Sequence, residues 1–453
     1  MFKKLRHYAR LVMGRKSRGP VVIRRQDHCI SRSLIDPDAL KVMYRLRRAG
    51  HIAYLAGGGV RDLLLGRKPK DFDVVTDAHP RQVKRLFSNC FLVGRRFRLA
   101  HIHCGGKIIE TSTFRRRPPA DAAADEESMK HRRENTFGTP QEDARMRDFT
   151  INGLYYDIGT FSIIDHVGGQ KDLERGLIRC IGDPSIRFPE DPVRMIRAVR
   201  FASRMGFTIE KRTYRAIVAH HREIEKAAPP RLLEEVYRLF GYGTGREAVR
   251  MLADTGLLSV ILPAVDAYLR ALEPEGLSLW ACLEAVDRME ADPSVPAEAA
   301  ILSALFFPLF EARLRRQGLS GDDDQQELAR EVLREAAGTL PVPRRIIDRM
   351  ARSFDAQRRL ESEGGRFNRR RFALQETFSD ALLVRELVLR ARGGDLACLA
   401  PWRELKKQLV TAAAAPQRRP DQAASAPDSK KRPARRRRRR RKPAEACEPA
   451  AAE

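Results

Sequence analysis

Residues 70–76 have the sequence KDFDVVT, in which two aspartates alternate with apolar residues. In a strand, residues i and i+2 point to the same face, so a strand over residues 72–75 would place the carboxylates of Asp71 and Asp73 side by side. Adjacent carboxylates repel each other unless a cation lies between them, and hard divalent cations prefer oxygen ligands. This stretch therefore predicts a site for divalent metal ions, although two exposed aspartates on an edge strand would show the same spacing.

A glycine turn precedes this stretch. Residues 54–66 have the sequence YLAGGGVRDLLLG, which predicts a strand, a turn of three glycines and the start of a helix. Glycines at such a turn let the backbone approach a ligand closely, and its N–H groups can bind an anion. Gly58 and the guanidinium of Arg61 are therefore candidate ligands of a phosphate group. The alternative is an ordinary turn between a strand and a helix.

Two further carboxylates are candidates for completing an acidic site. Glu110 lies in the predicted strand 108–114 beside apolar residues, where a carboxylate needs a partner. Asp148 lies in the sequence RDFTING, in which Arg147 and Asn152 are hydrogen-bond donors, so this segment could bind a sugar and a phosphate. The alternative for Asp148 is a capping role, since it precedes an apolar run that we expect to be helical.

Residues 190–201 have the sequence EDPVRMIRAVRF and contain most of a predicted basic helix over residues 192–205. Asp191 is expected to cap the helix, since the proline that follows suits a first helical turn. Arg194, Arg197 and Arg200 then lie on one arc of the helix surface. A carboxylate beside an arginine can recognise the polar edge of a base, and the other arginines can hold phosphates. A solvated basic face is the alternative.

The composition favours a polyanionic partner. The chain has 453 residues and a formal net charge of +27. Residues 416–453 contain 13 Lys/Arg and 5 Asp/Glu, a charge of +8, so the remainder still carries +19.

Seven cysteines without a CxxC pair favour a reducing, cytoplasmic location. Residues 101–104 (HIHC) match no common zinc spacing and are predicted to lie in a strand. The most apolar stretch, residues 299–310, is too short to span a membrane; we expect a core helix broken at Pro308.

The predicted fold class is α+β, because strand patterns fade after residue 182 and helical patterns follow. These patterns predict an α/β head, an all-helical body and a basic tail, and the family resemblance described below implies that the head has a mixed sheet and that the helical part divides into neck, body and tail domains. The predicted segments are a basic, poorly ordered N-terminal extension (1–26), the head (27–180), the neck (181–255), the body and tail (256–415) and a disordered arginine-rich tail (416–453).

Five segments together carry a family resemblance. They are HCISR (28–32), YLAGGGVRDLLLG, KDFDVVT, MRDFTIN (146–152) and EDPVRMIRAVRF. In this order they resemble the bacterial poly(A) polymerases, within the class II tRNA nucleotidyltransferase branch of the polymerase-β superfamily. The resemblance implies a nucleotidyltransferase head, an RNA-binding neck and transfer of AMP units from ATP to RNA 3′ ends with release of pyrophosphate. It also implies two metal ions, Mg²⁺ with Mn²⁺ as the alternative.

The resemblance also implies roles for single residues. Asp71 and Asp73 match the metal ligands, Asp148 an active-site aspartate, and Glu110 the third acidic position. The remaining matches are the triphosphate-binding turn (Gly58, Arg61), the ribose-reading segment (Arg147, Asp148, with Asn152 beside them) and the base-reading pair (Asp191, Arg194), with Arg197 and Arg200 nearby. Met146 departs from the family pattern, in which an arginine is usual, and this departure bears on the ribose contacts.

Poly(A) synthesis is favoured over CCA addition to tRNA, the other activity of this branch. Residues 92–99 and HCISR resemble segments typical of the polymerases, and the arginine-rich tail suits RNA binding without sequence preference. A non-catalytic RNA-binding protein is the alternative from another class. The expected partners are RNA 3′ ends, ATP and components of the RNA-decay machinery. We do not expect the protein to bind a membrane.

Overall fold

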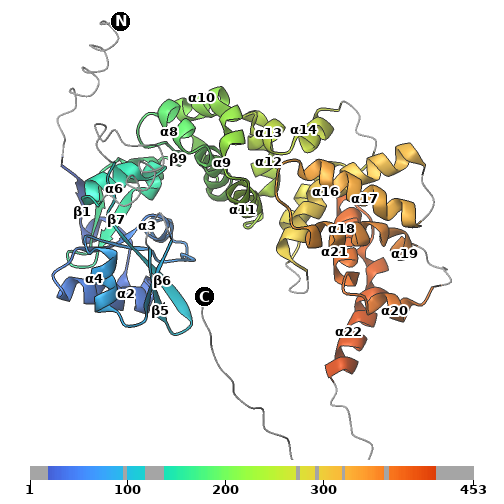
Figure 1. The fold of residues 1–453 in the computed structure, drawn as a ribbon, viewed down its shortest axis with the longest axis horizontal. Coiled ribbons are helices and arrows are strands. Elements are labelled where there is room, and N and C mark those ends of the chain that lie inside the picture. Colours follow the sequence, from blue (N-terminus) through green and yellow to red (C-terminus); the bar gives the residue numbers. More distant parts are fainter. Residues whose placement is uncertain are drawn as a thin grey trace, which may run out of the picture. The chain divides into compact units, whose positions relative to one another are not determined.

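The computed structural model describes residues 19–94, 99–117, 137–271, 276–290, 295–318, 322–361 and 367–414. The chain divides into two compact units, Met1–Lys406 and Lys407–Glu453. The arginine-rich tail (416–453) and most of the charged segment 116–134 lie outside the described residues. The first unit holds the sheet and almost all of the described helices (Figure 1).

A mixed sheet of eight strands organises the head, which confirms the predicted α+β class. Its order is β1-β8-β7-β2-β3-β6-β5-β4, and only the β3–β6 pair is parallel. The strands are β1 (Val21–Ile23), β2 (Ala53–Ala56), β3 (Val74–Thr76), β4 (Cys90–Val93), β5 (Leu99–Cys104), β6 (Lys107–Thr113), β7 (Leu154–Asp157) and β8 (Ser162–Asp165).

Each face of this sheet is covered by its own apolar cluster. Helices α2 (Pro37–Arg48) and α4 (Pro80–Leu86) pack side by side on one face, where residues such as Met43 and Val74 are buried (Figure 1). The other face buries Phe114 and Tyr155, with Ala144 of α6 (Pro140–Met146). Helix α3 (Gly58–Leu64) follows β2 directly, so the glycine turn lies at the end of a central strand.

Two expectations for the head are wrong. The apolar run after Asp148 is not a helix but a single 3-10 turn, η3 (Thr150–Asn152), followed by β7. β7 lies between β2 and β8 and is buried along its whole length, and a short continuous apolar run of this kind has no period that separates strand from helix. The expected poorly ordered extension is also wrong for residues 21–23, because β1 pairs with β8 at the edge of the sheet.

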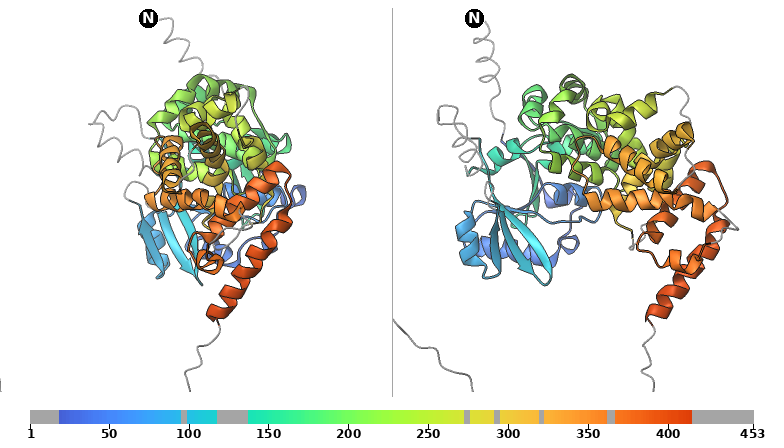
Figure 2. Two further views of the ribbon diagram at one scale, coloured as in Figure 1. Left: turned by 90° about the vertical axis from the view of Figure 1, so that its right-hand side faces the viewer. Right: turned by 45° about the vertical axis from the view of Figure 1, so that its right-hand side comes forward.

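Helices dominate the rest of the chain. The short strands β9 (Leu177–Ile178) and β10 (Thr208–Ile209) pair in parallel, and after β10 every regular element of the described residues is helical, as the views in Figure 2 show. The helices are α7 (Gly169–Glu174), α8 (Pro184–Glu190), α9 (Val193–Met205), α10 (Lys211–His220), η4 (His221–Lys226), α11 (Pro229–Leu239), α12 (Gly245–Asp254), α13 (Leu257–Ile261), α14 (Pro263–Arg270), α15 (Leu279–Arg288), α16 (Ala297–Gln317), α17 (Asp322–Ala337), α18 (Arg344–Asp355), α19 (Gln357–Glu361), α20 (Arg369–Ala373), α21 (Phe378–Arg392), η5 (Leu396–Leu399) and α22 (Ala400–Ala414).

Helix α16 is the predicted core helix, but Pro308 does not break it. The helix continues through Pro308 to Gln317, and its residues 301–308 are all buried. Burial around the whole circumference supplies packing that outweighs the cost of a proline inside a helix, about 3 kcal/mol. Among the described helices, none combines the length and the apolar character that crossing a bilayer requires.

Candidate active site

Asp71 and Asp73 lie directly before β3 and not within it, so the predicted strand start at residue 72 is two residues too early. The alternation of faces nevertheless extends through them, because both aspartates are exposed while Phe72 is partly buried and Val74 is buried. The Asp73 carbonyl accepts a hydrogen bond from the Ala56 N–H at 3.0 Å, which continues the pairing with β2. The two carboxylates are therefore fixed at the end of a central strand.

Glu110 is the third carboxylate at this end of the sheet. β3 and β6 are parallel with Val74 opposite Thr111, so Asp73 lies beside Glu110. Although the Asp73 residue as a whole is exposed, protein atoms displace much of the water around its carboxyl group. This loss of water, the negative charge of Glu110 and that of Asp71 raise the pKa of Asp73 to about 6, although the positive charge of Arg147 opposes the shift. The surroundings of Asp73 therefore disfavour its negative charge in the absence of a cation.

A divalent metal ion fits this donor set. Within the described residues, no three acidic, His or Cys side chains converge closely enough to form a complete metal site. Mg²⁺, however, commonly binds one or two carboxylates and completes its shell with water and substrate phosphates. Asp71 and Asp73 supply such a pair, and a bound cation would relieve the repulsion that raises the pKa of Asp73.

His101 is the partner of Glu110 across the sheet. The two residues pair in the β5–β6 register, and Nε2 of His101 lies 3.8 Å from the Glu110 carboxylate. His101 therefore belongs to a strand, as predicted, and no zinc-type cluster surrounds it among the described residues.

The charged side chain of Arg147 packs against the glycine turn. Gly57 has φ +65° and ψ −126°, and a Cβ atom added there would lie 2.7 Å from Nη1 of Arg147. A Cβ atom on Gly59 would lie 3.4 Å from the Asp71 carbonyl oxygen. The turn thus packs between Arg147 and the acidic segment, and Gly57 is a position that only glycine suits.

Arg61 lies under the same turn and is engaged internally. Its side chain is buried, with Nε and Nη2 donating to Oδ1 of Asp62 at 2.8 and 2.6 Å. Its Nη1 donates to Oδ1 of Asn152 at 2.6 Å. Burial lowers the pKa of Arg61, although the negative charge of Asp62 opposes this shift. The structure therefore places Arg61 beside the predicted phosphate turn, but its donors are directed into the protein.

Arg147 is held by three groups. Its guanidinium pairs with Asp143 at 3.1 Å, donates to the Tyr155 hydroxyl at 3.3 Å and donates to the Asn152 carbonyl at 3.3 Å. It also lies over the Tyr155 ring, 5.2 Å from its centroid. These contacts hold the guanidinium in one position against Gly57.

Asp148 faces the helical neck. Nε and Nη2 of Arg197 on α9 donate to its Oδ2 at 2.9 and 2.7 Å. Asn152 and the Phe149 N–H donate to its Oδ1 at 3.0 and 2.8 Å. Burial alone would raise the pKa of Asp148, but the charge of Arg197 and these hydrogen bonds lower it to about 2. Its oxygens are engaged here, so Glu110, and not Asp148, is the acidic residue that lies beside Asp73.

A buried glutamate pairs with two of the three arginines on the α9 arc. Glu235 on α11 accepts from Nη1 of Arg197 at 3.3 Å and from Nε of Arg200 at 2.7 Å. Both arginines are therefore paired, and neither is free for phosphate in this structure. The sequence analysis missed Glu235. Its position beside Leu232 and Leu239 on the apolar face of α11 is the pattern that could have identified a buried acid in need of a cation.

Asp191 and Arg194 lie together, as predicted. The Nε of Arg194 is 3.9 Å from the Asp191 carboxylate, and its Nη1 donates to the Arg187 carbonyl at 2.8 Å. Arg231 contacts the same carboxylate at 3.3 Å. The predicted capping role of Asp191 is wrong, because Pro192 is the N-cap of α9 and no side chain caps this helix.

Comparison with known proteins identifies related chains. Residues 53–179 match the family described as "Poly A polymerase head domain" and residues 206–269 the family "Probable RNA and SrmB- binding site of polymerase A". The chain is 39% identical to poly(A) polymerase I of Escherichia coli O6:H1, covering 89% of this chain and 91% of that protein. It is 38% identical to poly(A) polymerase I of Salmonella typhi, covering 81% and 83% of the two chains.

A solved structure shares the fold. The crystal structure of the Bacillus stearothermophilus CCA-adding enzyme in complex with CTP aligns with a TM-score of 0.59 and 25% sequence identity, covering 83% of each chain.

Proposed function

Because the chain belongs to the bacterial poly(A) polymerase family, and is therefore a polynucleotide adenylyltransferase, we propose that it adds AMP units from ATP to RNA 3′ ends without a template and releases pyrophosphate. The observation that carries this proposal is the 39% identity with a poly(A) polymerase over 91% of that protein's length. CCA-adding enzymes match a shorter part of the chain: that of Lactobacillus helveticus is 38% identical over 223 residues, which is 48% of this chain and 53% of that protein. This likeness keeps CCA addition as the second candidate activity.

Asp71 and Asp73 are proposed to hold the catalytic metal ions, Mg²⁺ or Mn²⁺. When bound, the ions would favour ionisation of the RNA 3′ hydroxyl and neutralise the leaving pyrophosphate. Glu110 adds a third negative charge beside Asp73, which favours cation binding at this end of the sheet. The exposed carboxylates leave room for substrate phosphates to complete the metal shell.

The triphosphate is proposed to lie along the glycine turn. Gly58 has only the Arg61 Nη2 atom within 4 Å of an added Cβ, so the backbone is open to a ligand there. Arg61 and Arg147 donate to Asn152, and Asn152 donates to Asp148, so we assign these three residues the role of fixing the turn. They would act on the nucleotide through the position of the backbone.

The base is proposed to be read by Asp191 and Arg194. The carboxylate can accept from the adenine amino group while the guanidinium donates to a ring nitrogen, a pairing that favours adenine in a fixed orientation. Asp148 and Arg197 would keep helix α9, which carries Arg194, at a fixed distance from the glycine turn.

The test is an incorporation assay with the purified full chain. Generic RNA and a tRNA without its CCA end are each incubated with Mg²⁺ and with ATP alone, CTP alone, or ATP and CTP together. We expect long A-tracts on generic RNA with ATP alone. Extension that requires CTP and stops after CCA on the tRNA would overturn poly(A) synthesis, and no incorporation on either RNA would favour the non-catalytic alternative. Asp71→Asn serves as the inactive control.

A further inference from the structure

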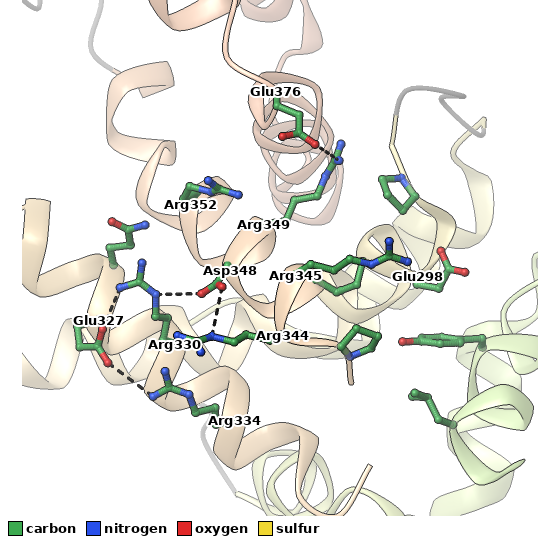
Figure 3. Close-up of a pocket in the computed structure, with 16 residues that line it drawn as sticks. Glu298, Glu327, Arg330, Arg334, Arg344, Arg345, Asp348, Arg349, Arg352 and Glu376 are labelled. Atoms are coloured by element: carbon green, nitrogen blue, oxygen red, sulfur yellow. Dashed lines mark hydrogen bonds and ion pairs between the residues drawn. The ribbon is translucent and has the colours of Figure 1, made fainter. Parts of the chain in front are cut away.

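A depression lined by arginines lies in the helical part of the chain, apart from the carboxylates described above (Figure 3). Its volume is about 890 Å³, and α11, the start of α16, α17 and α18 form its walls. The charged residues that line it are six arginines and four carboxylates, without a lysine: Arg330, Arg334, Arg344, Arg345, Arg349, Arg352, Glu298, Glu327, Asp348 and Glu376. These arginines lie outside residues 206–269, which match the RNA-binding family.

Two of the six arginines are neutralised by close ion pairs. Arg330 contacts Glu327 at 2.9 Å and Asp348 at 3.3 Å. Arg349 contacts Asp380 at 2.6 Å and Glu376 at 3.3 Å. These pairs fix the walls of the depression and leave little charge for a ligand.

The remaining arginines carry the positive charge of the depression. Arg345 and Arg352 form no ion pair with any described residue, and Figure 3 draws them without a dashed line. They are seven residues apart on α18, two helical turns, so they lie on one side of the helix about 10 Å apart along its axis. Arg344 and Arg334 make only longer contacts, at 3.8 Å with Asp348 and 3.6 Å with Glu327.

The opposite wall offers an aromatic ring. Tyr237 of α11 lines the depression beside Leu233, and its buried hydroxyl has no hydrogen-bond partner among the described residues. Burial raises the pKa of the Tyr237 hydroxyl. Guanidinium forks match phosphate geometry, and an aromatic ring can stack on a base of any sequence. The two walls together fit nucleotides better than they fit a simple anion.

We infer that this depression binds the phosphate backbone of the RNA strand upstream of the 3′ end that is being extended. The inference rests on the proposed function, because it assigns the ligand to the RNA substrate. Arg345 and Arg352 would each contact one phosphate, and Tyr237 would contact a base or a sugar. An RNA long enough to reach the depression would then bind more tightly than a short primer.

The test compares RNAs of two lengths with the full chain. Fluorescence anisotropy gives the affinity for a labelled 20-nucleotide oligo(A) across a salt series, and incorporation of ATP on a five-nucleotide primer gives the chemistry. Loss of two phosphate contacts in Arg345→Ala/Arg352→Ala should weaken binding of the long RNA roughly tenfold and reduce the slope of log K against log salt by about 1.4. Incorporation on the short primer should remain unchanged.

Two variants control for general effects. Arg270→Ala/Arg288→Ala removes two exposed arginines outside the depression, which are 67% and 72% accessible, and should leave the affinity for long RNA within twofold. Arg345→Lys/Arg352→Lys keeps the charges and should restore most of the salt dependence.

The outcomes separate the two proposals. Equal affinities of wild type and the double alanine variant for the long RNA would overturn the inference while short-primer incorporation still supports the proposed function. If the two proteins bind the long RNA equally but the double alanine variant binds polyglutamate more weakly than the wild type, the inference is also overturned and the depression is assigned to an acidic protein. Absence of incorporation by the wild-type chain would refute the proposed function, whereas the binding comparison would still test the depression.

Discussion

Replacing Gly57 by alanine is expected to damage both the stability of the head and its chemistry. The residue has φ +65° and ψ −126°, a combination that costs an L-amino acid about 1–3 kcal/mol. The added Cβ atom would also lie 2.7 Å from Nη1 of Arg147. One of the two groups must move, so the substitution combines backbone strain with a steric clash.

The clash is costly because Arg147 is held on several sides. Moving its guanidinium away from Gly57 weakens the hydrogen bonds to Tyr155 and to the Asn152 carbonyl. A hydrogen bond to a charged group contributes about 1.5–3 kcal/mol. Together with the strain, the expected loss of stability is about 4 kcal/mol. Because the same turn packs against Asp71, a shift of about 1 Å should lower the rate of nucleotide incorporation about 100-fold.

Gly66→Ala is the matched control. Gly66 also has a positive φ, +68°, but nothing lies within 4 Å of its added Cβ. The Gly66→Ala variant should therefore lose only about 1–2 kcal/mol of its free energy of unfolding and keep the normal rate of nucleotide incorporation. Hydrogen exchange of head peptides in urea measures the stability, because Trp280 and Trp402 both lie in the helical part and their fluorescence would not report on the head. If G57A and G66A had equal stability and equal rates, the argument from the Arg147 contact would be refuted.

Three further predictions concern charge. Asp73→Asn should abolish nucleotide incorporation. Because the pKa of Asp73 is raised to about 6 in the folded protein, ionisation of the wild-type carboxyl destabilises the fold as the pH rises from about 4 through 6. The variant should therefore have a higher melting temperature than the wild type at pH 8, and Mg²⁺ should reduce this difference by stabilising the wild type. Asp148→Asn should lower the free energy of unfolding by about 2 kcal/mol at pH 7. The difference should shrink as the pH falls from 4 towards 2, because the folded-state pKa of about 2 is below that of the unfolded chain. Unfolding measured across an acid titration checks this prediction, and a difference that stays constant with pH would contradict it. Truncation after Ala415 should weaken RNA binding and its salt dependence while short-primer incorporation survives; an unchanged affinity across a salt series would instead indicate a solubility role for the arginine-rich tail.

Local patterns were sufficient to predict the centre of the candidate site. The alternation of residues 70–76 and the glycines of residues 57–59 are properties of short stretches, and they placed Asp71 and Asp73 on one side of the chain next to a turn. Glu110 was predicted on a strand, and the parallel β3–β6 register brings it to Asp73. The type and order of these elements followed from turn chemistry and side-chain period.

The partners of the arginines could not be predicted in the same way. Arg61 bonds to Asn152, 91 residues away, and Arg197 bonds to Asp148 and Glu235, which are 49 and 38 residues away. Each arginine is suited to phosphate by its chemistry, and only the tertiary fold decides that a carboxylate or an amide reaches it first. The misassigned strand β7 has a related cause, because burial on all sides removes the alternation that would have marked it.

The ion pair between Asp148 and Arg197 sets a lower limit on the size of a piece of this chain that can fold alone. A fragment that ended at residue 179, where the head-domain match ends, would lack Arg197 and also Arg204, which lies 3.0 Å from Asp62. Leaving a buried charge without its partner costs about 3–5 kcal/mol, a large part of the stability of an ordinary domain. The smallest autonomous fragment should therefore extend through α11, which supplies Glu235. Exchanges of segments between relatives are accordingly expected to succeed at a junction after Leu239 and to fail at residue 180.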